Sequence, residues 1–228
     1  MSAEPTPAAP RTGVTRRTTT PVETPIGADP RRAFLAAALR NPRRIGAVAP
    51  GSRGLADLLA SVVPTHGSPV VVELGPGTGS VSAAIADRLP ARARHFAVEL
   101  DPRLAAYLRQ AHPDMEVIDG NAAHLTGLLA ARSVPGVDAV VCGLPWSLFG
   151  RDTQRAILDQ VATAIGSTGA FATFAYTHTA PMSTARRFRR MLSDVFDEVV
   201  VSRTIWRNLP PAYAYVCRRP RVEGRYQS

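Results

Sequence analysis

Hydrophobic and polar positions follow two alternating patterns from residue 69 onward. Short apolar runs rich in Val, Ile and Ala predict strands, and segments with apolar residues at three- and four-residue spacing predict helices. The predicted strands are Val70–Leu74, His95–Glu99, Met115–Ile118, Asp138–Cys142, Ala170–Tyr176, Glu198–Ile205 and Ala212–Arg218. The predicted helices are Ser80–Leu89, Pro102–Ala111, Ala122–Ala131, Arg151–Ile165 and Thr184–Leu192. This alternation indicates an α/β fold with a mostly parallel sheet and helices on both faces.

The last two predicted strands depart from this alternation. Glu198–Ile205 and Ala212–Arg218 are joined by a short loop with two adjacent prolines and no helical pattern between them. A short connection joins antiparallel neighbours, whereas a parallel crossover needs about a dozen residues or more. We therefore expect a seven-stranded sheet that carries an antiparallel pair of strands at its end.

The first 66 residues contain no strand pattern. Residues 1–28 are rich in Pro, Thr and Ala, a composition that predicts a disordered tail. Asp29-Pro30 supplies an N-cap and a first-turn proline for a helix at Arg31–Arg40, and Ser52–Val63 has the pattern of a second helix. We expect three further units: N-terminal helices at 29–66, the main domain at 67–220 and a C-terminal tail at 221–228.

The helix Arg31–Arg40 combines an apolar side with a rim of arginines. Phe34 and Leu35 lie on the apolar side, and Arg43 and Arg44 extend the rim beyond the helix. Two interpretations remain open. The helix docks on the domain as a lid with a solvated rim, or it lies on an anionic membrane surface.

Composition narrows the class of protein. The chain has 228 residues, of which 45% are hydrophobic, enough for one sizeable core. No apolar run approaches the roughly 20 residues of a membrane span, and the N-terminus lacks the apolar core of a secretion signal, so we expect a cytoplasmic protein. Cys142 and Cys217 lie far apart in apolar runs, which predicts buried thiols. The five histidines show no metal-ligand spacing, so we expect no metal site.

Charge is distributed unevenly along the chain. All 27 basic residues are arginine, and the formal net charge is +9. Residues 1–69 hold nine arginines and four acids, residues 70–181 eight and ten, and residues 182–228 ten and four. A polyanionic partner would therefore meet the two flanks, and both anionic lipid and nucleic acid fit this pattern.

The sequence from Val70 to Gly79 carries the clearest signal for a ligand. A strand pattern ends in a turn with glycine at positions 75, 77 and 79, where bare backbone can approach a ligand closely. A dinucleotide fingerprint would place glycine at position 80, where this chain has Ser80. Glu73 would repel a pyrophosphate but suits a positively charged ligand. We therefore expect S-adenosylmethionine, bound by Glu73, Gly75, Gly77 and Gly79.

Two further strand ends supply polar groups at the same edge of the predicted sheet. Glu99 closes the second strand, where a carboxylate can accept hydrogen bonds from both ribose hydroxyls. Asn121 and Ala122 follow the third strand, and the Asn121 amide suits the adenine edge because it offers both an acceptor and a donor. The alternative for Asn121 is a helix N-cap, the role that also explains Asp101.

Together these motifs resemble the cofactor motifs of class I S-adenosylmethionine-dependent methyltransferases. The resemblance rests on Glu73–Gly79, Glu99, Gly120–Ala122 and Gly143–Trp146. With further matching segments at Arg40–Ser52, through Tyr176 and at Asn208–Ala212, it spans about residues 31–218. It implies a Rossmann-like sheet and S-adenosylmethionine as cofactor. Within the class, the chain is similar to two families, the ribosomal RNA adenine dimethyltransferases and the bacterial phospholipid N-methyltransferases. The family pattern usually has Asp where this chain has Asn121.

The segment after the fourth strand separates these two families. The adenine dimethyltransferases resemble one another in an Asn-Leu-Pro-Tyr tetrad, whose amide accepts from the target amine and whose ring stacks on a flipped base. Gly143 stands at the first position here, so base methylation loses support, and the phospholipid family has a similar Ser-Gly-Leu-Pro segment. The resemblance implies that Gly143 binds the cofactor and that Leu144, Pro145 and Trp146 bind substrate, Trp146 by a cation–π contact with a methylated ammonium.

The reaction expected of this family is displacement at the sulfonium methyl group by a neutral amine. An acceptor close to the amine nitrogen would assist. Tyr176 at the end of the fifth strand is the first candidate for this catalytic role, and His178 is the second. Asn208, just before the Pro-Pro turn, is expected to shape the substrate pocket.

Three functions remain open. The resemblance and the basic N-terminal helix favour N-methylation of a phosphatidylethanolamine-type head group by a protein peripheral to the inner face of the cell membrane. A small-molecule methyltransferase of secondary metabolism is second, because Cys142 and Asn121 depart from the family pattern. RNA adenine methylation is third.

Overall fold

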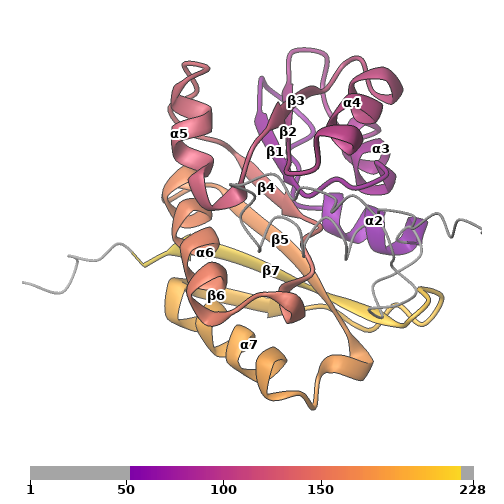
Figure 1. The fold of residues 1–228 in the computed structure, drawn as a ribbon, viewed down its shortest axis with the longest axis vertical. Coiled ribbons are helices and arrows are strands. Elements are labelled where there is room, and N and C mark those ends of the chain that lie inside the picture. Colours follow the sequence, from indigo (N-terminus) through magenta and orange to yellow (C-terminus); the bar gives the residue numbers. More distant parts are fainter. Residues whose placement is uncertain (1–51, 222–228) are drawn as a thin grey trace, which may run out of the picture.

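The protein is described by a computed structural model that covers residues 52–221 (Figure 1). The predicted tail at 1–28, the predicted helix Arg31–Arg40 and the last residues, 222–228, lie outside the described residues. The membrane-surface role of that N-terminal helix, like the division into four units, therefore stays a prediction.

A seven-stranded sheet forms the centre of the described part. In chain order its strands are β1 (Val70–Leu74), β2 (Arg94–Glu99), β3 (Glu116–Asp119), β4 (Ala139–Cys142), β5 (Ala170–Tyr176), β6 (Phe196–Val201) and β7 (Ala212–Pro220). Their order across the sheet is β3-β2-β1-β4-β5-β7-β6. The strands from β1 to β5 pair in parallel, and β7 pairs antiparallel with both β5 and β6. The order reverses between β1 and β4, which is where open α/β sheets bind ligands.

Helices cover both faces of this sheet (Figure 1). They are α2 (Arg53–Ala60), α3 (Ser80–Ala86), α4 (Pro102–Ala111), α5 (Leu125–Ala130), α6 (Arg151–Ile165) and α7 (Ser183–Val195), with short 3-10 turns η2 (Ala122–His124), η3 (Trp146–Leu148) and η4 (Thr177–Thr179). Asp101 accepts a hydrogen bond from the Arg103 backbone N–H at 2.8 Å and thereby caps α4, which confirms the predicted cap.

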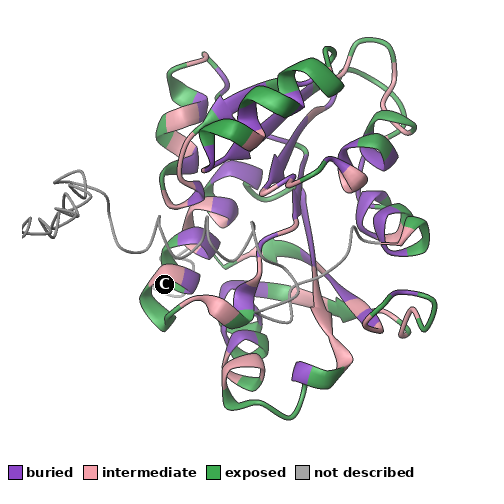
Figure 2. Ribbon diagram, turned by 45° about the vertical axis from the view of Figure 1, so that its right-hand side comes forward, coloured by how far each residue is buried: buried purple, intermediate pink, exposed green. Residues whose placement is uncertain are grey.

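Alternate residues of each strand pack into two different layers. In β1, Val72 and Leu74 pack with residues of α5, α6 and α7, whereas Val71 packs with residues of α2 and α3. Figure 2 shows the resulting distribution, with buried residues along the strands and exposed residues on the outer sides of the helices. Cys142 and Cys217 are buried free thiols as predicted, and burial raises the pKa of each to about 12.

The sequence predicts the strands and helices of this part closely, and the differences lie at their ends. β1, β5, α4 and α6 have their predicted bounds. The strand predicted to reach Ile205 stops at Val201, because Ser202 caps the ladder by accepting from the Ala214 N–H through its side chain at 2.9 Å. Ile205 keeps an isolated bridge to Ala212. Among the helices of residues 52–221, none has the length and apolar character to cross a membrane.

Candidate functional site

Backbone hydrogen bonds bring the carboxyl ends of four strands together. The Gly75 N–H donates to the Val98 carbonyl at 3.0 Å, and the Gly143 N–H donates to the Leu74 carbonyl at 2.8 Å. The Gly120 N–H donates to the Glu99 carbonyl at 3.0 Å. The turns that follow β1, β2, β3 and β4 are therefore neighbours at one edge of the sheet, as the sequence predicted for a ligand site.

The glycines of the first turn have different surroundings. All three have positive φ angles, 67° at Gly75, 59° at Gly77 and 85° at Gly79. A β-carbon at Gly75 would lie 2.6 Å from Leu144 Cδ2, and one at Gly79 would collide with the His112 ring. A β-carbon at Gly77 would meet nothing within 4 Å. Gly75 and Gly79 are thus packed against protein, and Gly77 is the glycine that borders open space.

Glu99 is a buried carboxylate held beside this turn. Its side chain accepts from the Leu100 and Asp101 N–H groups through Oε1, at 2.8 and 2.9 Å. Oε2 accepts only a long hydrogen bond, 3.4 Å, from the Gly77 N–H. Burial raises the pKa of Glu99, although these backbone hydrogen bonds lower it in part. Oε2 is therefore the oxygen with remaining capacity to accept from a ligand.

Glu73 also lies at this edge, but its contacts are with protein. Its Oε2 accepts a hydrogen bond from the Ser82 hydroxyl of α3 at 2.6 Å and lies 3.7 Å from His95 Nε2 of β2. The residue is 1% exposed. One oxygen thus ties β1 to α3, while Oε1 accepts no hydrogen bond from the residues between 52 and 221.

The sequence did not point to Ser82 or His95. Both are buried, Ser82 in a helix and His95 in a strand. A polar residue at a position that the pattern predicts to be buried is the one sequence signal that could have pointed to them. His95 Nε2 is buried and has no hydrogen-bond partner among the described residues. The contacts with Ser82 and His95 fix the position of the Glu73 carboxyl group between β1, β2 and α3.

Asn121 is the N-cap of η2, which is the second of the two roles that the sequence left open. Its Oδ1 accepts from the Ala123 N–H at 3.0 Å and caps η2, while Ala122 is buried behind it. The capping bond uses one of the two lone pairs of Oδ1, so the amide still offers the Nδ2 donor and the second lone pair of Oδ1. The cap and the predicted contact with adenine are therefore compatible.

Gly143 and Leu144 pack against the glycine turn. A β-carbon at Gly143 would lie 2.7 Å from the Gly75 carbonyl oxygen, so this position accepts no side chain without a shift of the backbone. Leu144 is buried, and Pro145 is half-buried at the start of η3. These residues shape the wall of the site at the point where β4 ends.

Trp146 occupies the core. Its indole N–H donates to Thr173 Oγ1 at 2.7 Å, and its ring stacks on Phe188 of α7 with centroids 4.4 Å apart. Phe149 and Phe171 contact the same ring edge-on. Trp146 is 4% exposed, so the predicted contact with a methylated ammonium would require its ring to be uncovered. The placement assigns Trp146 a packing role under the site.

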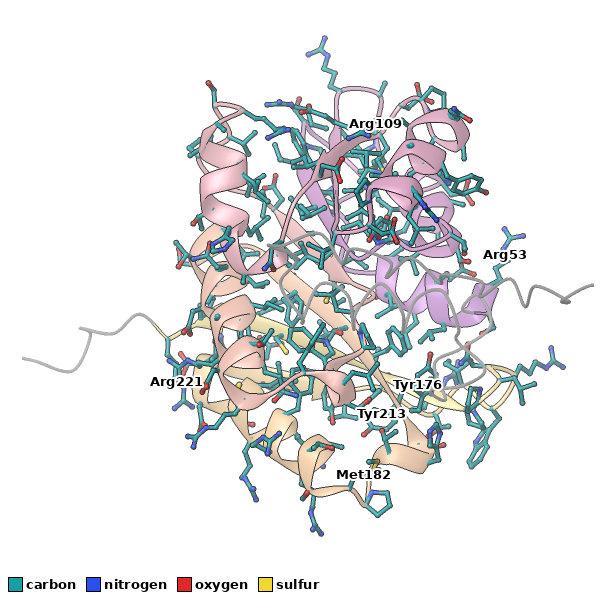
Figure 3. All side chains as sticks on the ribbon, in the orientation of Figure 1. Arg53, Arg109, Tyr176, Met182, Tyr213 and Arg221 are labelled. Atoms are coloured by element: carbon teal, nitrogen blue, oxygen red, sulfur yellow. The ribbon has the colours of Figure 1, made fainter. Side chains whose placement is uncertain are left out.

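Tyr176 ends β5, and His178 follows it in η4; Figure 3 labels Tyr176. Their rings stack with centroids 5.6 Å apart, and Phe174 contacts Tyr176 edge-on at 5.2 Å. Burial raises the pKa of Tyr176, so its phenol is neutral near pH 7. Tyr176 is half-buried and His178 is exposed.

Asn208 is buried and bonded to backbone at both ends of its amide. Oδ1 accepts from the Ser52 N–H at 2.8 Å, and Nδ2 donates to the Pro210 carbonyl at 2.6 Å. Asn208 therefore connects the loop between β6 and β7 to the start of α2. Its predicted influence on the substrate pocket would act through the position of this loop.

The described residues contain no cluster of His, Cys, Asp and Glu side chains that could hold a metal ion. The site is accordingly built from backbone, two buried carboxylates, an amide and a tyrosine. Such a set can bind a ligand with ribose hydroxyls and positive charge, and it can present an acceptor group at the end of β5.

Comparison with curated proteins identifies two relatives. The chain is 35% identical over 188 residues to the ornithine lipid N-methyltransferase of Singulisphaera acidiphila, covering 81% of this chain and 94% of that protein. It is 35% identical over 79 residues to the ribosomal RNA small subunit methyltransferase A of Chlorobaculum parvum, covering 35% of this chain and 27% of that protein. No protein-family model matches the chain.

Solved structures share the fold at low identity. A SAM-dependent O-methyltransferase from Thermotoga maritima superposes with a TM-score of 0.59 at 13% identity, covering 81% of this chain and 72% of that one. A TehB-like SAM-dependent methyltransferase from Corynebacterium glutamicum gives 0.53 at 15%, covering 84% and 100%. Fibrillarin from Aeropyrum pernix, with S-adenosyl-L-methionine bound, gives 0.55 at 16%, covering 72% and 74%.

Proposed function

Because the chain belongs to the S-adenosylmethionine-dependent methyltransferases, in the family of the ornithine lipid N-methyltransferase, we propose that it methylates the amine of a lipid head group. The observation that carries the lipid assignment is the likeness to that enzyme, which extends over nearly its whole length. The likeness to the ribosomal RNA enzyme is confined to about a third of this chain.

Two observations on the described residues support binding of S-adenosylmethionine. Open space borders Gly77, and Glu99 offers Oε2 beside that space. In the proposed site, Gly77 allows the ligand to lie against the main chain, and Glu99 accepts from the ribose hydroxyls. Glu73 contributes a fixed negative charge that favours the ammonium and sulfonium groups, and Asn121 offers Nδ2 to a ring nitrogen of adenine.

S-adenosylmethionine, when bound, supplies an electrophilic methyl group. The residues at the end of β5 act on the acceptor. The neutral phenol of Tyr176 can accept a hydrogen bond from the attacking amine, which orients the nitrogen lone pair. Desolvation at this half-buried position favours the uncharged amine, since burial disfavours the ammonium form. We assign transfer of the released proton to solvent to His178, because it is exposed and stacked on Tyr176.

Gly143 argues against base methylation. A side chain at this position would meet the Gly75 carbonyl oxygen, so the turn has no room for the amide that the adenine dimethyltransferase tetrad requires. The basic flanks of the chain are then better explained by an anionic lipid surface than by RNA. A small amine acceptor remains the competing proposal, and the choice of acceptor decides between the two.

The test supplies labelled S-adenosylmethionine together with separate pools of amino lipids, RNA and small amines. Ornithine lipid and phosphatidylethanolamine are dispersed in detergent, so that membrane binding is not required. We expect label in the lipid fraction, and loss of that label with Gly77→Leu as the matched inactive control. Label in the small-amine pool alone would replace the lipid proposal with the small-molecule one.

A further inference from the structure

The loop between β6 and β7 displays two large hydrophobic side chains to solvent. Trp206 is 76% exposed and Leu209 is 80% exposed, the highest values for large hydrophobic residues in the described part of the chain. Tyr107 of α4 follows at 51%. Two such residues within four positions of one loop are a local feature and not scattered surface exposure.

Hydrogen bonds within the loop keep these two side chains on its outer side. Asn208, between them in sequence, is 1% exposed and bonds to Ser52 and Pro210 through its amide. The Asn208 N–H also donates to the Ile205 carbonyl at 3.2 Å. Because Asn208 is fixed inward by three hydrogen bonds, the neighbouring positions 206 and 209 are presented on a rigid turn.

Positive charge accompanies the exposed apolar pair. Arg203 and Arg207 are both exposed, and neither forms an ion pair with a residue between 52 and 221. The sequence from Val199 to Arg221 contains no Asp or Glu. An apolar tip whose arginines form no ion pair among residues 52–221 matches the interface of an anionic bilayer, where acyl chains lie beneath phosphates.

The loop stands beside the proposed acceptor position. The Thr177 N–H and its hydroxyl both donate to the Pro211 carbonyl, at 2.9 and 3.1 Å. Thr177 directly follows Tyr176, and the loop extends from the same side of the molecule as the end of β5 (Figure 1). A surface that binds this loop would therefore face the site.

We propose that residues 203–209 form a membrane-docking loop. Trp206 and Leu209 insert at the head-group level of an anionic bilayer, and Arg203 and Arg207 bind lipid phosphates. Tryptophan suits this position because its ring is apolar and its indole N–H can stay hydrated. The inference rests on the proposed function, since docking here brings the site to a lipid acceptor, and it concerns a surface separate from the predicted N-terminal helix.

The two tryptophans of the chain make a direct test available. Trp146 is buried and Trp206 is exposed, so a change of emission on vesicle binding reports Trp206. Full-length protein is mixed with vesicles of phosphatidylglycerol and phosphatidylcholine, or of phosphatidylcholine alone; neither contains a primary amine. We expect a blue shift with the anionic vesicles, quenched by brominated acyl chains. Trp206→Phe should still sediment with vesicles but lose the shift.

Variants separate insertion from charge. Trp206→Ala combined with Leu209→Ser should lower partitioning onto anionic vesicles by about tenfold or more, because apolar burial is lost. The matched control is Tyr107→Ala. Arg203→Ser and Arg207→Ser should each lower partitioning by about fivefold at low salt. The charge-matched control is Arg92→Ser, an exposed arginine just before β2, which lies on the other side of β1 from β7 and β6 in the sheet.

The outcomes distinguish this inference from the proposed function. Methylation of detergent-dispersed lipid with no Trp206 shift on any vesicle would overturn the docking loop and leave the function standing. A vesicle-induced shift without lipid methylation would support docking and remove the proposed acceptor. A shift produced by an RNA oligonucleotide but not by vesicles, or equal losses in the control variants, would also overturn the loop assignment.

Discussion

Replacing Glu99 with Gln tests whether this carboxylate binds the ribose of the cofactor. The Leu100 and Asp101 N–H groups both donate to Oε1, so the amide oxygen of glutamine will take the place of Oε1. The NH2 group then stands where Oε2 was, facing the Gly77 N–H. Two donors meet there, and the acceptor for the ribose hydroxyls is gone.

The expected loss follows from that geometry. A hydrogen bond to a charged group contributes about 1.5–3 kcal/mol, so loss of one corresponds to about a 10- to 100-fold rise in Kd. The fold should persist. Burial raises the pKa of Glu99 because desolvation penalises the charged carboxylate, and a neutral amide removes that penalty while weakening the backbone hydrogen bonds. We expect the melting temperature without ligand to change little.

Calorimetry with S-adenosylhomocysteine measures this loss of affinity. Repeating the measurement with an analogue that lacks the ribose hydroxyls completes a double-mutant-type cycle of two proteins and two ligands. The wild-type protein should distinguish the two ligands, and Glu99→Gln should bind them with similar affinity. If the hydroxyl-free analogue weakens binding equally in both proteins, Glu99 does not contact the ribose, and the reasoning from Oε2 is wrong.

Three further predictions concern titration, anchoring and catalysis. Binding of S-adenosylhomocysteine should weaken as the pH falls through the raised pKa of Glu99, because protonation replaces the charged acceptor with a neutral, weaker one, and a pH series of Kd values should lose this step in Glu99→Gln. Asn208→Ala should lower the free energy of unfolding by about 1–3 kcal/mol in denaturant titrations, since it leaves the Ser52 N–H and Pro210 carbonyl unpaired; an unchanged midpoint would contradict the anchoring role. Tyr176→Phe should lower kcat about 10- to 100-fold without changing cofactor Kd, and an unchanged kcat would exclude a role for the hydroxyl.

The strands and the cofactor edge could be predicted because both depend on local sequence. Valine-rich runs fixed the positions of β1 and β4, and glycines at positions 75, 77 and 79 indicated close approach of backbone to a ligand. The sequence could not tell which glycine borders open space. That distinction depends on Leu144 and His112, which pack against Gly75 and Gly79 from other parts of the chain.

Residues whose roles depend on distant partners were less predictable. Trp146 follows a strand end, where an aromatic ring suggests a substrate contact, yet Phe188 from α7 stacks on it and Thr173 takes its N–H. Asn121 forms the helix cap that the sequence allowed as one alternative, and its role toward adenine stays a prediction. A role that depends on neighbouring residues, such as a helix cap, can be predicted from the sequence. Burial by residues that are distant in the sequence, as at Trp146, is seen only in the folded structure.

The two sides of the proposed site, one for the cofactor and one for the acceptor, depend on different kinds of structure. The cofactor side is formed by turns that directly follow adjacent strands, so the sheet itself positions Gly77 and Glu99. The acceptor side depends on Asn208, which joins residues 156 positions apart by bonding to Ser52. Changes in the loop between β6 and β7 can therefore alter the acceptor or the surface that delivers it, while the cofactor turns stay in place. Under the proposed function, we therefore expect the cofactor motifs to indicate the class of enzyme, and the end of β5 and that loop to determine the acceptor.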